Sequence, residues 1–142
     1  MLSLCIGLML FAIYLFLSAI HFYWGLGGKR GIDAMIPTND NNDKIMSPGW
    51  FECFVVAIGL LAIGFFILIK IQIFSVGLPS FILKFGLMTV SSLFIFRSIG
   101  EFKYIGFFKR VRNTKFGRMD TKYYSPLCLF IGIFGIILEL IK

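Results

Sequence analysis

Residues 2–24 read LSLCIGLMLFAIYLFLSAIHFYW, an apolar run without a charged side chain. A helix needs about 20 mainly apolar residues to cross the roughly 30 Å of hydrocarbon in a bilayer. The run is therefore long enough to form a first membrane-spanning helix. It lacks the basic start and the small-residue cleavage site of a signal peptide, so we expect it to remain in the mature protein.

The composition extends this prediction to the whole chain of 142 residues. Hydrophobic residues make up 58% of it and aromatic residues 18%, whereas soluble domains are about 45–50% apolar. A soluble domain of this size has too little interior to bury the surplus. The apolar side chains must therefore face lipid, and we predict a single integral membrane domain over residues 1–142.

Three further runs have the length and composition of membrane spans: 50–69, 80–100 and 126–141. Ser47-Pro48 and Ser125-Pro126 stand at the start of the first and the last of them. A hydroxyl side chain before a helix and a proline in its first turn both favour a helix start. The sequence therefore predicts an all-α fold, a membrane-spanning four-helix bundle with loops at 25–49 and 101–125.

The third run contains two basic residues, Lys84 and Arg97. They are separated by about 20 Å along a helix at 1.5 Å per residue, so each can extend its charge to the nearer interface. The run also carries small residues that allow close approach of neighbouring helices: Gly86, Thr89, Ser91 and Ser92.

The distribution of Lys and Arg orients the helices. Cytoplasmic loops of membrane proteins carry the excess of these residues. Most of them lie in or beside the loops 25–49 and 101–125: Lys29, Arg30, Lys44, Arg97, Lys103, Lys109, Arg110, Arg112, Lys115, Arg118 and Lys122. The opposite side has only Lys70, Lys84 and Lys142. We therefore predict that both loops are cytoplasmic and that both termini lie outside.

The two loops differ in character. Residues 25–49 are rich in Gly, Asn and Asp, and should be irregular, with Ile36-Pro37 packing back on the bundle. Residues 101–112 interleave aromatic and basic side chains, so they either extend the third helix or lie in the membrane interface. The net charge of +7 is concentrated beside the spans, where it meets anionic head groups. We therefore expect the lipid bilayer as partner and no nucleic acid.

The predicted orientation brings several polar and aromatic residues to the cytoplasmic end of the bundle. Ionisable residues at the ends of or inside a span are costly and often functional. They form a candidate binding cluster: His21, Tyr23, Trp24, Glu52, Arg97, Glu101 and Asp120.

Two members of this cluster have both a structural and a functional interpretation. Arg97 and Glu101 are spaced i, i+4 and can pair on one helix face. In the structural interpretation, Arg97 pairs with Glu101 and anchors its span. In the functional interpretation, Arg97 faces the bundle and binds a phosphate or carboxylate through two parallel hydrogen bonds. Glu52 stabilises the start of its helix through the helix dipole, or it pairs with Arg97 or His21 across the bundle.

The sequence predicts no catalytic residue, metal or cofactor. His21 is the only histidine, which excludes a haem held by two histidines within one chain, and no zinc-ligand spacing surrounds it. The cysteines Cys5, Cys53 and Cys128 form no CxxC pair. No P-loop, HExxH, dinucleotide fingerprint or Ser-His-Asp arrangement is present.

Three elements together resemble an uncharacterised family of small bacterial four-helix integral membrane proteins, catalogued as a domain of unknown function. They are HxYWxxGG (His21 to Gly28), Arg97 with Gly100-Glu101, and Phe116 through Asp120-Thr121 to Tyr124-Ser125-Pro126. The resemblance covers nearly the whole chain. It implies a four-helix membrane domain in a bacterial plasma membrane, and it implies no activity.

We expect a binding or accessory subunit for a lipid, a small amphiphile or a partner membrane protein, with Arg97, Glu52 and His21 fixing the polar end. The alternative is a membrane-embedded enzyme acting on a lipid or isoprenoid, with His21 or Glu52 as acid or base. A small transporter subunit is the third hypothesis. Four helices leave little room for a pathway in a monomer, so this hypothesis requires a homo-oligomer.

Overall fold

The computed structural model describes all 142 residues and contains helices, but no strand beyond one isolated bridge between Thr38 and Lys44. The helices are α1 (Leu2–Gly25), α2 (Ile32–Met35), α3 (Trp50–Lys70), α4 (Ser80–Ile99), α5 (Lys115–Met119), the π-helical turn η1 (Asp120–Tyr124) and α6 (Ser125–Ile141). Four of these helical stretches are long and apolar enough to cross a membrane. The predicted all-α, four-helix membrane fold is confirmed.

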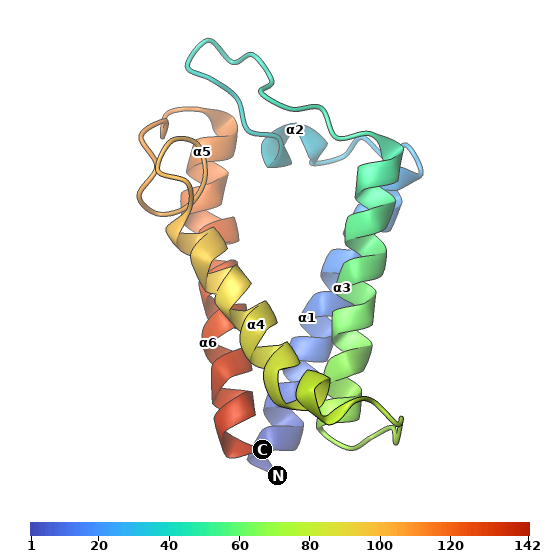
Figure 1. The fold of residues 1–142 in the computed structure, drawn as a ribbon. Coiled ribbons are helices and arrows are strands. Elements are labelled where there is room, and N and C mark those ends of the chain that lie inside the picture. Colours follow the sequence, from blue (N-terminus) through green and yellow to red (C-terminus); the bar gives the residue numbers. More distant parts are fainter.

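The long helices form two pairs, α1 with α3 and α4 with α6 (Figure 1). In the first pair, Ser18 Oγ donates a hydrogen bond to the Ala57 carbonyl across 2.7 Å. In the second pair, Gly132 and Gly135 of α6 lie against Ser91 of α4, which is buried. Small residues at both contacts allow the backbones to approach closely, as expected for helices packed in lipid.

The two pairs meet near the chain termini and diverge away from them (Figure 1). We call the end with the termini the narrow end. The opposite end, where α1 ends and α3 begins, is the wide end. The buried core of the narrow half combines Leu10 and Tyr14 of α1 with Leu87 of α4 and Leu138 of α6. At the narrow end, Lys70 Nζ lies 2.8 Å from Glu139 Oε1, an ion pair that joins α3 to α6 with both side chains largely buried.

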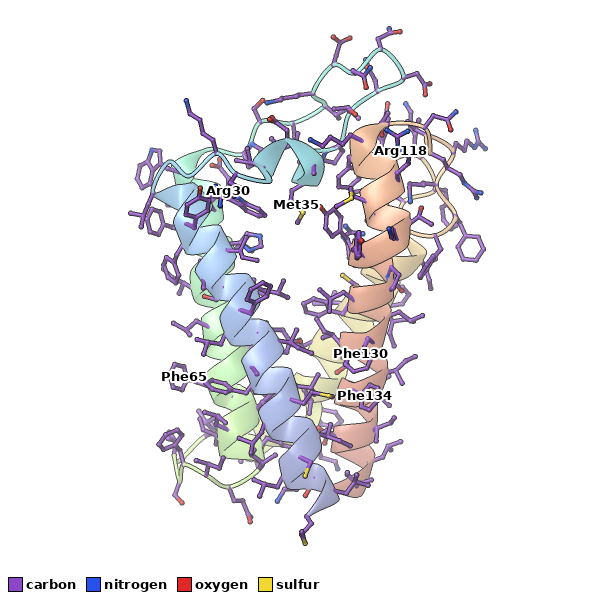
Figure 2. All side chains as sticks on the ribbon, turned by 180° about the vertical axis from the view of Figure 1, so that it is seen from behind. Arg30, Met35, Phe65, Arg118, Phe130 and Phe134 are labelled. Atoms are coloured by element: carbon purple, nitrogen blue, oxygen red, sulfur yellow. The ribbon has the colours of Figure 1, made fainter.

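The outer faces of the long helices expose large apolar side chains, including Val55, Phe65, Leu93 and Phe96. Phe65 points outward from α3 in Figure 2. Such faces need hydrocarbon rather than water as their solvent. With four helices of spanning length, they make the chain a multi-pass membrane protein.

The two long connections at the wide end are more structured than the sequence indicated. Ile36 and Pro37 are buried, as predicted, and α2 lies across the wide end (Figure 1). Residues 101–112 do not extend the third helix. The helix ends at Ile99 because Gly100 takes a φ of 86° and the chain folds back, so that Phe107 N donates to the Ser98 carbonyl at 2.8 Å. From residue 115 onward, the predicted loop is already helical.

Candidate functional site

The turn that follows α1 is held by the two aromatic residues at the end of the helix. Trp24 Nε1 donates to the Arg30 carbonyl at 3.0 Å, and Arg30 N donates to the Tyr23 hydroxyl at 3.4 Å. The Tyr23 ring covers Gly28 so closely that a Cβ there would lie 2.4 Å from a ring carbon. The end of α1 and the tight turn after it therefore position Trp24 and lead the chain into α2.

A hydrogen bond from η1 anchors the helix α2 to the second pair of long helices. Tyr124 Oη donates to the Ala34 carbonyl at 3.2 Å, although the two residues are 90 positions apart. A surface ion pair of 3.1 Å joins Asp33 of α2 to Lys44. Met35 points from α2 into the space between α1 and α6 (Figure 2). The helix α2 thus covers the gap between the two helix pairs.

A cavity of about 480 Å³ lies beneath α2, between α1 and the start of α6. Apolar and aromatic side chains line it from three directions: Phe16, Leu17 and Ile20 of α1, Ala34 and Met35 of α2, and Met119, Tyr123, Tyr124 and Leu127 of α5, η1 and α6. Its few polar groups lie toward the wide end, on Arg30 and the tyrosines. The volume falls in the range of small-molecule binding sites.

A second, smaller cavity of about 140 Å³ lies between α1, α3 and the connection that contains α2. His21, Trp24 and Glu52 line it together with apolar side chains. Trp24 and Met35 belong to the linings of both cavities, so the two are neighbours. The smaller cavity therefore adds an imidazole and a carboxylate to the polar side of the larger one.

A buried ionic cluster, centred on Asp120, holds the second pair of helices at the wide end. Asp120 is fully buried, and its two carboxylate oxygens lie 3.0 Å from Arg97 Nη2 and 3.0 Å from Lys109 Nζ. Gly106 N and Ser125 Oγ also donate to it, at 2.9 and 3.0 Å. The cluster ties α4, the segment 100–114 and the start of α6 into one unit.

Lys109 is the residue of this cluster that the sequence did not single out. Its side chain is fully buried, and its ammonium also donates to the Gly106 carbonyl at 2.9 Å and to Thr121 Oγ1 at 2.6 Å. With three acceptors, all of its donor capacity is used. A buried lysine of this kind is structural, because no free hydrogen bond remains for a ligand.

The structure divides the predicted seven-residue cluster into separate groups. His21, Trp24 and Glu52 line the smaller cavity, and Tyr23 and Trp24 line the larger one. Arg97 and Asp120 form the ion pair of the buried cluster. These two groups belong to different helix pairs.

The predicted pair of Arg97 with Glu101 is wrong, because α4 ends before residue 101 and Arg97 binds Asp120 instead. Glu101 Oε1 accepts a hydrogen bond from Tyr104 N at 2.8 Å and stays at the surface. Glu52 forms no ion pair with Arg97 or His21. Its position in the first turn of α3 agrees with a favourable interaction with the helix dipole.

The ionisable groups that line the smaller cavity include the His21 imidazole and the Glu52 carboxylate. No three His, Cys, Asp or Glu side chains converge in a way that could hold a metal ion. His21 Nδ1 lies 2.8 Å from the Leu17 carbonyl, so this nitrogen carries the proton of the neutral ring and Nε2 remains free to accept. The wide end therefore presents a large apolar cavity beside a smaller, mainly apolar one whose lining includes His21 and Glu52.

Comparison with protein-family models gives one match, described as "Protein of unknown function (DUF3995)", which covers residues 14–135. No curated protein and no solved structure matches the chain. The matched range includes α2, α3 and α4 in full, the second half of α1, most of α6, both cavities and the buried cluster. Since the family model spans most of its length, the chain belongs to this family of proteins of unknown function.

Proposed function

We propose that this membrane protein binds an amphiphilic lipid at the wide end, with the hydrocarbon part in the larger cavity. The observation that carries the proposal is the cavity of about 480 Å³ beneath α2, whose lining is almost entirely apolar. It lies between α1 and α6, which diverge toward the wide end (Figure 1). A ligand that reaches it from the bilayer needs no aqueous path.

The size of the cavity favours a lipid chain over a partner helix. A helix with its side chains is about 10–12 Å across and rises about 5.4 Å per turn, so a single turn would already fill a space of this volume. The cap formed by α2 also blocks a helix that continues past the wide end. An acyl or isoprenoid chain is narrow enough to enter from the side.

The polar groups at the rim suit the head of such a molecule. Arg30 and the tyrosines lie on the wide-end side of the cavity lining. Arg presents donors in a fork that matches phosphate and carboxylate oxygens. An amphiphile with its chain below α2 would therefore place an anionic group near Arg30.

We also propose that the protein lies in a bacterial plasma membrane with the wide end in the cytoplasm. Lysines and arginines of both wide-end connections support this orientation by the positive-inside rule. The predicted lipid head group would then lie at the cytoplasmic leaflet.

The orientation predicts which loop positions react with a membrane-impermeant thiol reagent. Asn41 and Ser75 are exposed positions in the connections at the wide and the narrow end. In a Cys5→Ser background, Ser75→Cys should be labelled in intact cells, whereas Asn41→Cys should be labelled only after permeabilisation. Cys53 and Cys128 lie within α3 and α6 and serve as the unlabelled background. The reverse labelling pattern would overturn the orientation.

The lipid proposal predicts that filling the cavity removes the bound molecule. Leu127→Trp places a larger ring into the cavity lining, and native mass spectrometry of protein extracted in mild detergent should show at least a tenfold loss of retained lipid, equivalent to about 1.4 kcal/mol. Leu93→Trp, on the exposed face of α4, is the matched control and should retain lipid as the wild type does.

Two results of this measurement would contradict the proposal. One is a wild-type protein that carries no lipid and acquires none from added phospholipid. The other is an equal effect of the two tryptophan substitutions. A copurified partner chain, lost in Leu127→Trp alone, would show that the cavity takes a protein segment instead.

A further inference from the structure

We propose that the bound lipid carries a positively charged amine, which occupies the smaller cavity between His21, Trp24 and Glu52. This inference rests on the proposed lipid-binding function. It adds the class of head group that the site selects.

The first support is the unpartnered carboxylate of Glu52. Asp33, Asp120 and Glu139 each have a basic partner within 4.0 Å, but Glu52 has none. Asp40, Asp43 and Glu101 also lack a basic partner, but of these four acidic residues only Glu52, an exposed side chain, lines one of the two cavities. A carboxylate that lines a cavity without a protein cation is available to a cation from outside.

The second support is the set of groups that faces the same cavity. His21 donates from Nδ1 to the Leu17 carbonyl, which leaves Nε2 as an acceptor for an ammonium proton. The Trp24 indole packs edge-on against the imidazole with ring centroids 5.2 Å apart. Tryptophan is the aromatic side chain that attracts cations most strongly. The Nε2 atom of His21, the carboxylate of Glu52 and the indole of Trp24 together provide the groups that bind a small protonated amine.

Third, the two cavities are neighbours, so a molecule in the larger one lies close to the groups of the smaller one. The smaller cavity, of about 140 Å³, shares Trp24 and Met35 with the larger one. Trp24 is held in place by its hydrogen bond to the Arg30 carbonyl, and Arg30 itself lines the larger cavity. An amphiphile with its chain below α2 would therefore bring a phosphate to Arg30 and an amine to Glu52.

This pattern of charges distinguishes a zwitterionic amine lipid from an anionic lipid. Arg30 alone would bind any phospholipid through its phosphate, whether or not the head group carries an amine. The carboxylate of Glu52 adds attraction for an ammonium group and repels a second anion. Arg30 and Glu52 together therefore favour a phospholipid with an amine head group over one with a glycerol head group and the same acyl chains.

The test compares dioleoyl-phosphatidylethanolamine with dioleoyl-phosphatidylglycerol by native mass spectrometry of the full chain in mild detergent. The wild type should prefer the ethanolamine lipid by about tenfold, the effect of one charge-assisted contact with a cation–π contribution. Glu52→Gln keeps the shape of the side chain and should reduce this preference to less than about twofold while still binding both lipids. Asp33→Asn, which removes an exposed carboxylate from the same end, should leave the preference unchanged.

A second comparison uses only the wild-type protein. N-acetylation of the ethanolamine lipid removes its positive charge but keeps its chains and phosphate, and should lower binding by the same factor of about ten. Free ethanolamine at the concentration of the lipid should displace nothing, because it lacks the chain that occupies the larger cavity.

The outcomes separate this inference from the proposed function. A protein that binds neither dioleoyl lipid contradicts lipid binding as such. Equal binding of the two lipids, an unchanged preference in Glu52→Gln, or equal binding of the N-acetylated lipid overturns the amine site and leaves lipid binding in place. Displacement by free ethanolamine also overturns the inference, because the site would then recognise a soluble amine.

Discussion

Asp120→Asn should lower the free energy of unfolding by about 3–5 kcal/mol, the usual cost of removing one partner from a buried ion pair. The ammonium of Lys109 lies 3.0 Å from this carboxylate, and both side chains are fully buried. Asparagine keeps the size of the residue, but it cannot neutralise Lys109 or Arg97. The segment 100–114 and the start of α6 should therefore lose their common attachment.

Thermal unfolding in mild detergent measures this effect, with Asp33→Asn as the matched control. Asp33 forms an exposed ion pair with Lys44, and such pairs contribute only about 0–1 kcal/mol. Adding Lys109→Met to Asp120→Asn should restore part of the stability, since the stranded charge is then gone. An Asp120→Asn midpoint as little changed as that of Asp33→Asn would show that the cluster does not stabilise the fold.

The four helices could be predicted from hydropathy for a physical reason. In hydrocarbon, every backbone N–H and C=O group must be bonded within its own segment, so an apolar run of sufficient length becomes a helix. The helices end within one or two residues of the predicted spans at most boundaries. The last helix, α6, begins within one residue of the predicted span, but it continues an unbroken helical stretch from Lys115, which hydropathy does not reveal because residues 115–125 are too polar.

The buried cluster was only half predicted. The sequence points to Asp120 and Arg97, but helical spacing pairs Arg97 with Glu101, and the positive φ of Gly100 ends the helix before that pair can form. Lys109 was indistinguishable from its basic neighbours, since its burial depends on the chain folding back after α4. One signal was available: Asp120 is the only acidic residue between positions 101 and 139, so it was the natural partner for a buried lysine.

The ion pair of Lys70 with Glu139 could have been predicted from the topology. Spans alternate in direction along the chain, so the second and fourth spans run the same way, and the C-terminal ends of α3 and α6 bring both residues to the same depth at the narrow end. The cavities, in contrast, depend on how far the two helix pairs diverge and on where α2 rests. A four-residue helix inside a polar connection gives no periodic signal strong enough to place it.

The contact between α4 and α6 gives the second large expected effect. A Cβ on Gly132 would lie 2.5 Å from Ile95 Cγ1, 2.8 Å from the Ser91 carbonyl oxygen and 3.2 Å from Ile95 N. Two of these atoms belong to the backbone of α4, so no side-chain rotation relieves the clash. Gly132→Ala should therefore separate the two helices and cost about 1–3 kcal/mol, as overpacking of a tight interface does.

Gly59→Ala is the control for this substitution, because Gly59 lies within α3 and a Cβ there meets no atom within 4 Å. Alanine in a helix interior is favoured over glycine by about 0.5–1 kcal/mol, so this variant should unfold at or above the wild-type midpoint. The same Gly→Ala substitution should therefore lower the stability at position 132 and maintain or raise it at position 59. If Gly132→Ala were as stable as Gly59→Ala, α4 and α6 would not pack as closely as the contact of Gly132 with Ser91 indicates. The position of α6, which lines the larger cavity, would then differ as well.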